Sequence, residues 1–343
     1  MAKIFALLHT QADGSLPKAA LETLAAAVNL NAQLGGSLKV GVLGTDAVAA
    51  ADTVAGCGAE AFLAVGDEAV AQSRYATDAL AATALIQAAG AEIVLAPDTS
   101  RFARCLPGVA HRVGAQIDTH IVAVGGEGGA VRAQRWFYRQ RILGSISRAA
   151  RPWMLLVDGG VSPAWQGSAG SANAQAVAVV FTAEDQRTTV KGVQAPAVDA
   201  QTIRPDALLL FVAGAGWTKK QKDGQAHIAD ASALIKGFLH SAKASLGSSK
   251  SLVDIQSEGQ ETLSFMSHMN QVGQTGSTPR HPKGLSTCCH GEEPHAVGWR
   301  FVNERRAINL DANCGWAQGK ADVVYVADAF EVMAKVNALL NVS

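Results

Sequence analysis

The sequence predicts an α/β protein built from two domains. Its 343 residues are long for a single hydrophobic core. Short apolar runs alternate with segments of helical period in the first 113 residues, and the same alternation returns after residue 207. Several strand-like segments with few helical residues between them separate the two stretches. We therefore expect a mostly parallel sheet with appended antiparallel strands in residues 1–190, a linker in 191–207, and a doubly wound parallel sheet in 208–343.

The parallel part of the first domain is predicted from four apolar runs, each followed by a longer helical pattern. Pro17 falls near the first turn of the first helix, where a missing N–H group costs nothing. The predicted strands are residues 3–8, 38–43, 61–65 and 93–96. The predicted helices are residues 16 to about 34, 46–54, 77–89 and 103–113.

The antiparallel part of the first domain and the elements of the second follow from the same reasoning. Five strand-like segments come in close succession, at residues 117–124, 131–138, 141–147, 153–158 and 177–181. In the second domain the predicted strands are residues 208–213, 284–289, 306–310 and 323–326. The predicted helices there are residues 228–245 and 329–340.

Composition excludes several classes of function. The 29 basic and 29 acidic residues cancel, and no basic stretch could neutralise a run of phosphates, so nucleic-acid binding has no electrostatic support. Apolar runs such as 207–213 are far too short to cross a bilayer. The five cysteines have no disulfide-framework spacing and indicate a reducing compartment. We expect a soluble, cytoplasmic bacterial protein that is normally covered by a partner, because a net charge near zero does little to keep copies apart.

Motifs of hydrolytic catalysis are missing from the sequence. It contains no Gly-x-Ser-x-Gly elbow, no Walker A loop and no His-Glu-x-x-His helix. We therefore predict no catalytic residues of that kind.

Two glycine-containing turns are candidate cofactor contacts. Gly214 and Gly216 follow an apolar strand, where a backbone without side chains can approach a phosphate, although a tight turn alone would explain them. Further along, Gln274, Thr275 and Gly276 place an amide and a hydroxyl in a turn. These groups can hydrogen-bond the edge of a flavin ring, and the alternative is a polar loop.

Two further segments carry charge or metal-binding side chains. Lys250 lies in a hydroxyl-rich turn and can stabilise negative charge beside a flavin, although most lysines are simply solvated. The segment 287–295 contains two adjacent cysteines and two histidines. Adjacent cysteines are poor tetrahedral ligands, and no second Cys-x-x-Cys pair completes a zinc or iron–sulfur site. We predict no metal there.

Taken in order, these segments resemble the electron transfer flavoprotein alpha subunit along nearly the whole chain. In the first domain the resemblance lies in residues 95–99, 106–110 and 117–119. In the second it lies in residues 247–254, 273–276, 308–311 and 321–330, together with His295. The resemblance implies a Rossmann-like C-terminal domain that holds FAD without a covalent bond. It also implies a heterodimer with a beta subunit, which carries electrons from a catabolic dehydrogenase to a quinone-linked acceptor.

The resemblance also implies roles for individual residues of the second domain. Ser249 and Lys250 would meet the flavin and phosphate region, and Thr275 would lie near the flavin N5. His295 would point at the pyrimidine end of the ring. Asn309 and Asp328 would point toward the adenosine part of FAD. The matching segments also contain the candidate contacts Asp254, Gly291 and Asp311.

The chain also departs from the family pattern at three places. Ala215 stands where the family has an arginine in its first glycine turn. Lys250 replaces another arginine, which keeps the charge but loses the planar fork. In residues 288–295 only Gly291 and His295 match the family clearly. These departures leave two alternatives open: a subunit of the same fold that binds a nucleotide other than flavin or serves assembly, and a metal-dependent redox protein using Cys288, Cys289 and His290.

Overall fold

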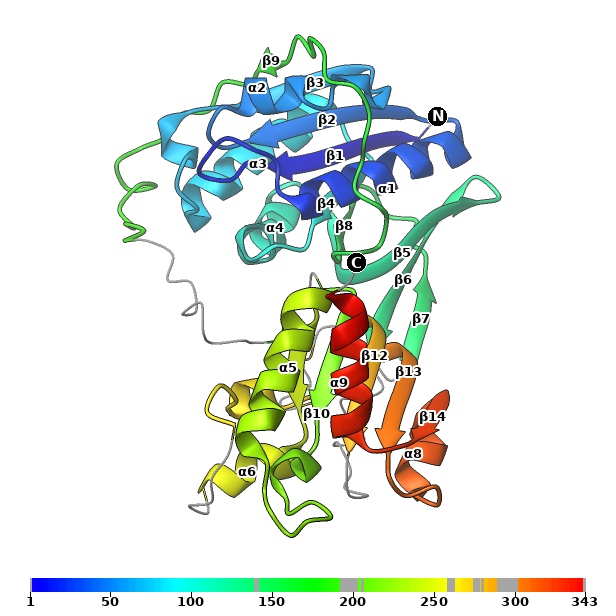
Figure 1. Ribbon diagram of the computed structural model, residues 1–343. Helices are drawn as coiled ribbons and strands as arrows, with labels where there is room; N and C mark the ends of the chain where they lie inside the picture. The colour runs from blue at the N-terminus through cyan, green and yellow to red at the C-terminus, as the bar shows by residue number, and fades with distance from the viewer. Residues whose placement is uncertain are drawn as a thin grey trace. The chain divides into compact units, whose positions relative to one another are not determined.

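The computed structural model divides the chain into two compact units, Met1–Val193 and Gln194–Ser343. It describes residues 2–138, 142–191, 203–204, 207–257, 263–273, 278, 281–288 and 302–341. Most of the segment predicted as a linker therefore lies outside the described residues. Figure 1 shows that each unit has its own sheet covered by helices.

The sheet of unit 1 is built on a central block of parallel strands. The block contains β1 (Lys3–His9), β2 (Ser37–Leu43), β3 (Ala61–Val65), β4 (Ile93–Pro97) and β8 (Trp153–Val157), and its order is β8-β4-β1-β2-β3. The chain proceeds outward from β1 through β2 and β3 on one side. It continues through β4 and β8 on the other side, so the direction reverses between β1 and β4.

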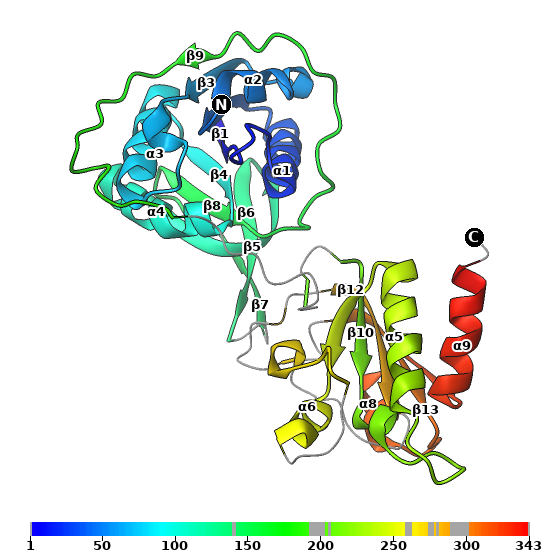
Figure 2. The same cartoon turned by 60° about the vertical axis from the view of Figure 1, so that its left-hand side comes forward.

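Helices cover both faces of this parallel block. Alternate residues of β1 point to opposite faces, so that Ile4 and Leu8 pack in one buried cluster and Phe5 and Leu7 in the other. The first cluster includes α1 (Lys18–Leu34) and α2 (Ala47–Asp52), and the second includes α3 (Tyr75–Ala89) and α4 (Ser100–Arg112). Figure 2 shows α1 and the α3–α4 pair on opposite sides of the strands.

Antiparallel strands extend the sheet beyond β8, as the sequence predicts, but the segment 153–158 was wrongly assigned to them, because β8 pairs in parallel with β4 and β5. Here β5 (Gln116–Glu127) runs parallel to β8, while β6 (Ala130–Phe137) and β7 (Ile142–Ile146) follow in antiparallel pairing. The predicted strand at 177–181 is wrong. The strand at the far edge is β9 (Gln175–Ala176), and the chain beyond it packs Val177, Val179 and Phe181 against the α3–α4 cluster.

Unit 2 contains a five-stranded sheet in which every pair of neighbours is parallel. Its strands are β10 (Leu209–Ala213), β11 (Ser245–Ser248), β12 (His281–Cys288), β13 (Val302–Asn309) and β14 (Val323–Val326), in the order β11-β10-β12-β13-β14. One face packs against α5 (Ile228–Ala242) and α9 (Ala329–Leu340). The other face forms a smaller cluster that includes residues of α8 (Gly315–Lys320). The predicted α/β class is confirmed in both units.

The strand β11 was not predicted, and the helix predicted at 228–245 reaches its first residue, Ser245. The helix ends at Ala242 because Lys243 adopts a left-handed conformation with φ of 50°. The strand that follows reads Ser-Leu-Gly-Ser, and a single apolar side chain gives no strand pattern. The helix α6 (Lys250–Ser257), which starts directly after this strand, was also not predicted.

None of the described helices combines the length and the apolar character that a membrane span requires.

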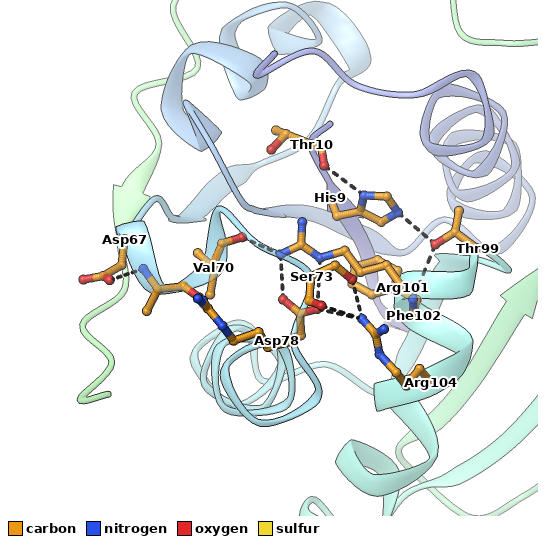
Figure 3. A network of polar contacts seen from close by, with 12 residues as sticks. His9, Thr10, Asp67, Val70, Ser73, Asp78, Thr99, Arg101, Phe102 and Arg104 are labelled. Atoms are coloured by element: carbon orange, nitrogen blue, oxygen red, sulfur yellow. Dashed lines mark hydrogen bonds and ion pairs between the residues drawn. The ribbon is translucent and has the colours of Figure 1, made fainter. Parts of the chain in front are cut away.

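A buried ion pair ties α3 to α4 in unit 1. The Asp78 side chain is fully buried, and Arg101 donates two hydrogen bonds to it, with lengths of 3.0 and 2.6 Å. The same guanidinium also donates to the carbonyl of Val70, 2.5 Å away. Figure 3 shows this group at the start of α4, with Arg104 approaching the same carboxylate from its other side. Burial is the largest influence on Asp78 and raises the pKa of its carboxyl, while Arg101 opposes that effect.

Removal of Arg101 is expected to destabilise unit 1 strongly. Replacement of Arg101 by Met leaves a buried carboxylate without its main partner, which costs about 3–5 kcal/mol of unfolding free energy. Arg104→Met is a matched control, because Arg104 lies 3.9 Å from Asp78 and its side chain is 45% exposed. That control is expected to cost below about 1 kcal/mol. Hydrogen–deuterium exchange of α3 and α4 peptides in the full chain measures both, and equal effects of the two substitutions would contradict the assignment.

His9, the last residue of β1, is hydrogen-bonded to Thr99, which lies just after β4. Its Nδ1 lies 3.1 Å from the carbonyl oxygen of Thr10, which can only accept, so Nδ1 carries the hydrogen. Its Nε2 then accepts from the hydroxyl of Thr99 at 2.8 Å. The ring of Phe102 packs edge-on against the imidazole. Burial lowers the pKa of His9 to about 4, because a charged imidazole would lose its hydration there.

We expect the stability of unit 1 to decline as the pH falls from 6.5 toward 4. In that window the unfolded chain binds a proton at His9 while the folded chain does not, so protonation favours the unfolded state by up to about 3 kcal/mol. His9→Asn should remove this part of the pH dependence, whereas His111→Asn, at an exposed position, should retain it. The measurement is the unfolding free energy at pH 7 and pH 4.5. An unchanged difference between these values in His9→Asn would refute the assignment.

Candidate cofactor site at the carboxyl edge of unit 2

Parallel pairing brings the carboxyl ends of all five strands of unit 2 to the same edge of the sheet. In open parallel sheets ligands bind at this edge, beside the strands where the chain changes direction. Here the chain passes from β10 to β11 on one side and then to β12 on the other. The crevice between the ends of β10 and β12 is therefore the position at which the topology favours a ligand.

The turn after β10 lies at this position. The N–H of Gly214 donates to the carbonyl of Thr287 on β12 at 2.9 Å, and a single 3₁₀ turn, η3 (Ala215–Thr218), follows. Trp217 in this turn is fully buried, and its indole N–H donates to the hydroxyl of Thr287 at 2.8 Å. That hydroxyl donates in turn to the carbonyl of Val212, 3.1 Å away. The turn carrying Gly214 and Gly216 is thus fixed to both strands of the crevice.

The residues after β11 extend the same edge. Ser249 is buried, its N–H donates to the carbonyl of Ala213 at 2.9 Å, and its hydroxyl caps α6 by accepting from the N–H of Leu252. Lys250 begins α6 and is 59% exposed, and its ammonium lies 3.8 Å from the carboxylate of Asp254. Exposed pairs of this kind contribute little to stability, so the charge of Lys250 remains available to a ligand.

The loop predicted to contact a flavin ring starts at this edge. The N–H of Val272 donates to the carbonyl of Ser248 at 3.0 Å, which joins the chain to the end of β11. Gly273 follows with φ of 85°, a conformation that favours glycine. Its N–H donates to the hydroxyl of Thr278 at 2.7 Å, so Gly273 and Thr278, the residues on either side of 274–277, are in contact. The predicted contacts Gln274, Thr275, Gly276, Gly291 and His295 lie outside the described residues.

Buried polar groups without partners lie on the same edge. Asn309 is the last residue of β13 and is fully buried. Its side-chain oxygen accepts from the N–H of Asp311 at 2.9 Å, but its Nδ2 group has no hydrogen-bond partner among the described residues. The hydroxyl of Ser248, the last residue of β11, is also buried and unpartnered within the described part of the chain. An unsatisfied buried polar group costs about 1–3 kcal/mol, so these two groups suit a ligand that supplies acceptors.

Asp311 and Asp328 have structural partners at this edge. Asp311 accepts from the N–H of Asn313 at 2.8 Å and so forms the turn after β13. Asp328 caps α9 by accepting from the N–H of Phe330 at 2.8 Å. The N–H of Ala327 donates to the carbonyl of Asn309 at 3.1 Å, which holds the start of α9 beside the end of β13. Asp311 is therefore joined to Asn309 by its own backbone N–H, and Asp328 follows Ala327, whose N–H is bonded to the Asn309 carbonyl.

The predicted residues divide into three groups. The strand ends bring Gly214, Gly216, Ser249, Asn309 and Asp328 to one edge. Lys250 and Asp254 lie on α6, which starts at that edge, and Asp311 lies in the turn after β13. The sequence analysis missed Trp217, Thr287 and Ser248, because a lone tryptophan or hydroxyl carries no signal until the strand order is known.

The alternative metal site falls largely outside the described residues. Only the backbone of Cys288 is described, at the end of β12, and Cys289, His290 and His295 are not. Among the described residues Cys57, Cys105 and Cys314 are buried free thiols. Burial raises the pKa of Cys105 to about 12, so this thiol is inert toward metals and oxidants.

Comparison with known proteins identifies the family through unit 1. The family model for the electron transfer flavoprotein domain matches residues 5–186, which is more than half of the chain. A comparison with curated protein sequences gives no match. The matched region is the mostly parallel sheet with its appended antiparallel strands, and it confirms the predicted family. The chain is therefore a member of the electron transfer flavoprotein family, whose proteins are flavoproteins that carry electrons.

Proposed function

We propose that this chain is the alpha subunit of an electron transfer flavoprotein that binds FAD at the carboxyl edge of unit 2. It pairs with a beta subunit in the cytoplasm. The heterodimer takes electrons from a catabolic dehydrogenase and delivers them to a quinone-linked acceptor at the membrane. Family membership through unit 1 supports the electron-transfer role, and the order of motifs in unit 2 supports the alpha subunit.

The observation that carries the FAD proposal is the side-chain NH₂ group of Asn309, which has no hydrogen-bond partner among the described residues. Its Nδ2 group is buried at the end of β13, on the same edge as the crevice between β10 and β12. FAD presents acceptors along its whole length, including ribose, pyrophosphate and ring oxygens. A ligand of this kind can satisfy several separated donors on one sheet edge at once.

The other residues of the edge fit the same ligand. FAD supplies the electron-accepting ring, and the protein supplies binding, orientation and charge. The Trp217–Thr287–Val212 chain of hydrogen bonds holds the first turn against the ends of β10 and β12. Lys250 adds one positive charge at the start of α6, and Gly273 directs the chain into the segment that carries Gln274 and Thr275.

Co-expression with a beta subunit of the same family is expected to yield a yellow heterodimer that contains one FAD. Asn309→Ala removes one donor to the cofactor and is expected to weaken FAD binding about two- to tenfold, in line with one neutral hydrogen bond. Asn341→Ala, at the exposed end of α9, is the matched control and should leave the affinity unchanged. Fluorescence titration of the FAD-free heterodimer measures all three affinities.

The same experiment separates the proposal from its alternatives. A folded heterodimer that stays colourless with excess FAD would contradict the proposal and favour a subunit that binds another nucleotide or serves assembly. Stoichiometric iron or zinc bound through cysteine, with no flavin, would favour the metal-dependent redox protein.

Lys250→Ala is expected to lower the reduction potential of the bound FAD. Loss of a positive charge disfavours the reduced flavin, which is more negative than the oxidised form. Because Lys250 is more than half exposed, the shift should be on the order of 20–30 mV, equivalent to about 1 kcal/mol for two electrons. Lys335→Ala, on the exposed face of α9, is the control. Equal reduction potentials in the wild type and in Lys250→Ala would show that this lysine does not act on the flavin.

A further inference from the structure

Three side chains with metal-binding atoms converge at the carboxyl edge of unit 1. Asp98 follows β4, Asp158 follows β8, and His120 lies in β5, so they come from three neighbouring strands. The Nδ1 atom of His120 lies 3.3 Å from Oδ2 of Asp98 and 3.3 Å from Oδ1 of Asp158. One ligand atom from each residue lies within 4.8 Å of the others.

The sheet itself holds these groups in place. The N–H of Asp98 donates to the carbonyl of Val157, and the N–H of Asp158 donates to the carbonyl of Ile121, each at 2.9 Å. His120 lies where the β5–β8 register shifts between Asp118 and Ile121. Rigid strands therefore fix the three positions, which is the condition for a preorganised site.

The distances differ from those of an ordinary hydrogen-bonded histidine. One imidazole nitrogen carries at most one hydrogen, so Nδ1 cannot donate well to two carboxylate oxygens at once. Both separations are also longer than a charge-assisted hydrogen bond. Tetrahedral ligands at the usual 2.0–2.2 Å from a zinc ion lie roughly 3.3–3.6 Å apart. The two distances at Nδ1 match that spacing.

A second histidine in the chain has the same neighbours in a different arrangement. His227 in unit 2 also lies beside two aspartates, but Asp223 is 2.7 Å from Nε2 while Asp230 is 3.3 Å from Nδ1. The two carboxylates thus approach opposite edges of the ring and cannot share one ion. Each group consists of one histidine and two aspartates. Only in the His120 group do both carboxylates approach the same ring nitrogen.

Asp98 is the most buried of the three side chains. Its side chain is only 9% exposed, and the backbone group that donates to it is the N–H of His120, at a long 3.2 Å. The guanidinium of Arg135 is close enough to influence His120, but it forms its ion pair with the carboxylate of Asp118, 3.5 Å away. A buried carboxylate normally has a cation or several donors beside it.

We propose that Asp98, His120 and Asp158 bind a divalent transition-metal cation, with Zn²⁺ as the best match to one nitrogen and two oxygen ligands. The His120 side chain is 66% exposed, so the fourth coordination position opens to water. Two carboxylates and a neutral imidazole carry two negative charges, which the ion neutralises. Protons compete with the metal for these ligands, so binding weakens as the pH falls.

Isothermal titration of the metal-free full chain with ZnCl₂ at pH 7.5 tests the site. The wild type should bind one ion there, and His120→Gln and Asp158→Asn should each lower that affinity at least tenfold. Both side chains are partly exposed, so the variants should fold, and circular dichroism checks this. Asp223→Asn, in the non-convergent His227 group, should leave the affinity unchanged.

Titration with Co²⁺ separates this site from the cysteines. Cobalt bound by Asp98, His120 and Asp158 gives no thiolate charge-transfer absorption, whereas cobalt bound by cysteine does. If the absorption of cobalt bound without thiolate disappears in His120→Gln, the proposal is supported. Absence of zinc binding, or the same affinity in the wild type and both variants, would overturn it. The group would then be a protonated histidine between two carboxylates.

Discussion

Parallel hydrogen bonding on both sides of β10 determines what unit 2 can do. Because β11 and β12 both run in the direction of β10, every loop that follows a strand emerges at one edge. Gly214, Ser249 and Asn309, which are far apart in the sequence, reach the same edge through this pairing and through that of β12 with β13. The buried Trp217–Thr287 bond then fixes the position where the chain reverses direction. Any cofactor proposal for this protein depends on that arrangement.

The sequence predicts the elements of the fold well wherever burial produces a pattern. The strand β3 and the helix α9 have the expected bounds, because β3 is a short continuous apolar run and the apolar residues of α9 recur with a helical period. The strand β11 has one apolar side chain, so its assignment depends on pairing with β10 rather than on its own residues. In 177–181 the side chains of Val177, Val179 and Phe181 are partly buried against the α3–α4 cluster, and periodicity cannot distinguish that from a strand.

The candidate sites show a similar division. Glycine turns and the charge of Lys250 are visible in the sequence, because their residue types are unusual at the ends of strands. The unpartnered amide of Asn309 and the convergence of Asp98, His120 and Asp158 are not visible, since both depend on strand order. His120 also has a φ of 56°, which turns the backbone in a way that no propensity predicts for histidine.

The hydrogen bond between His9 and Thr99 distinguishes the carboxyl edge of unit 1 from that of unit 2. Both units have a central strand where the chain changes direction, a position that suits ligands. In unit 1 an imidazole that stays uncharged at neutral pH joins the two strand ends at this position. A ligand there would have to displace that hydrogen bond. At the corresponding edge of unit 2 the Nδ2 group of Asn309 has no hydrogen-bond partner among the described residues, so a ligand there would meet a buried donor.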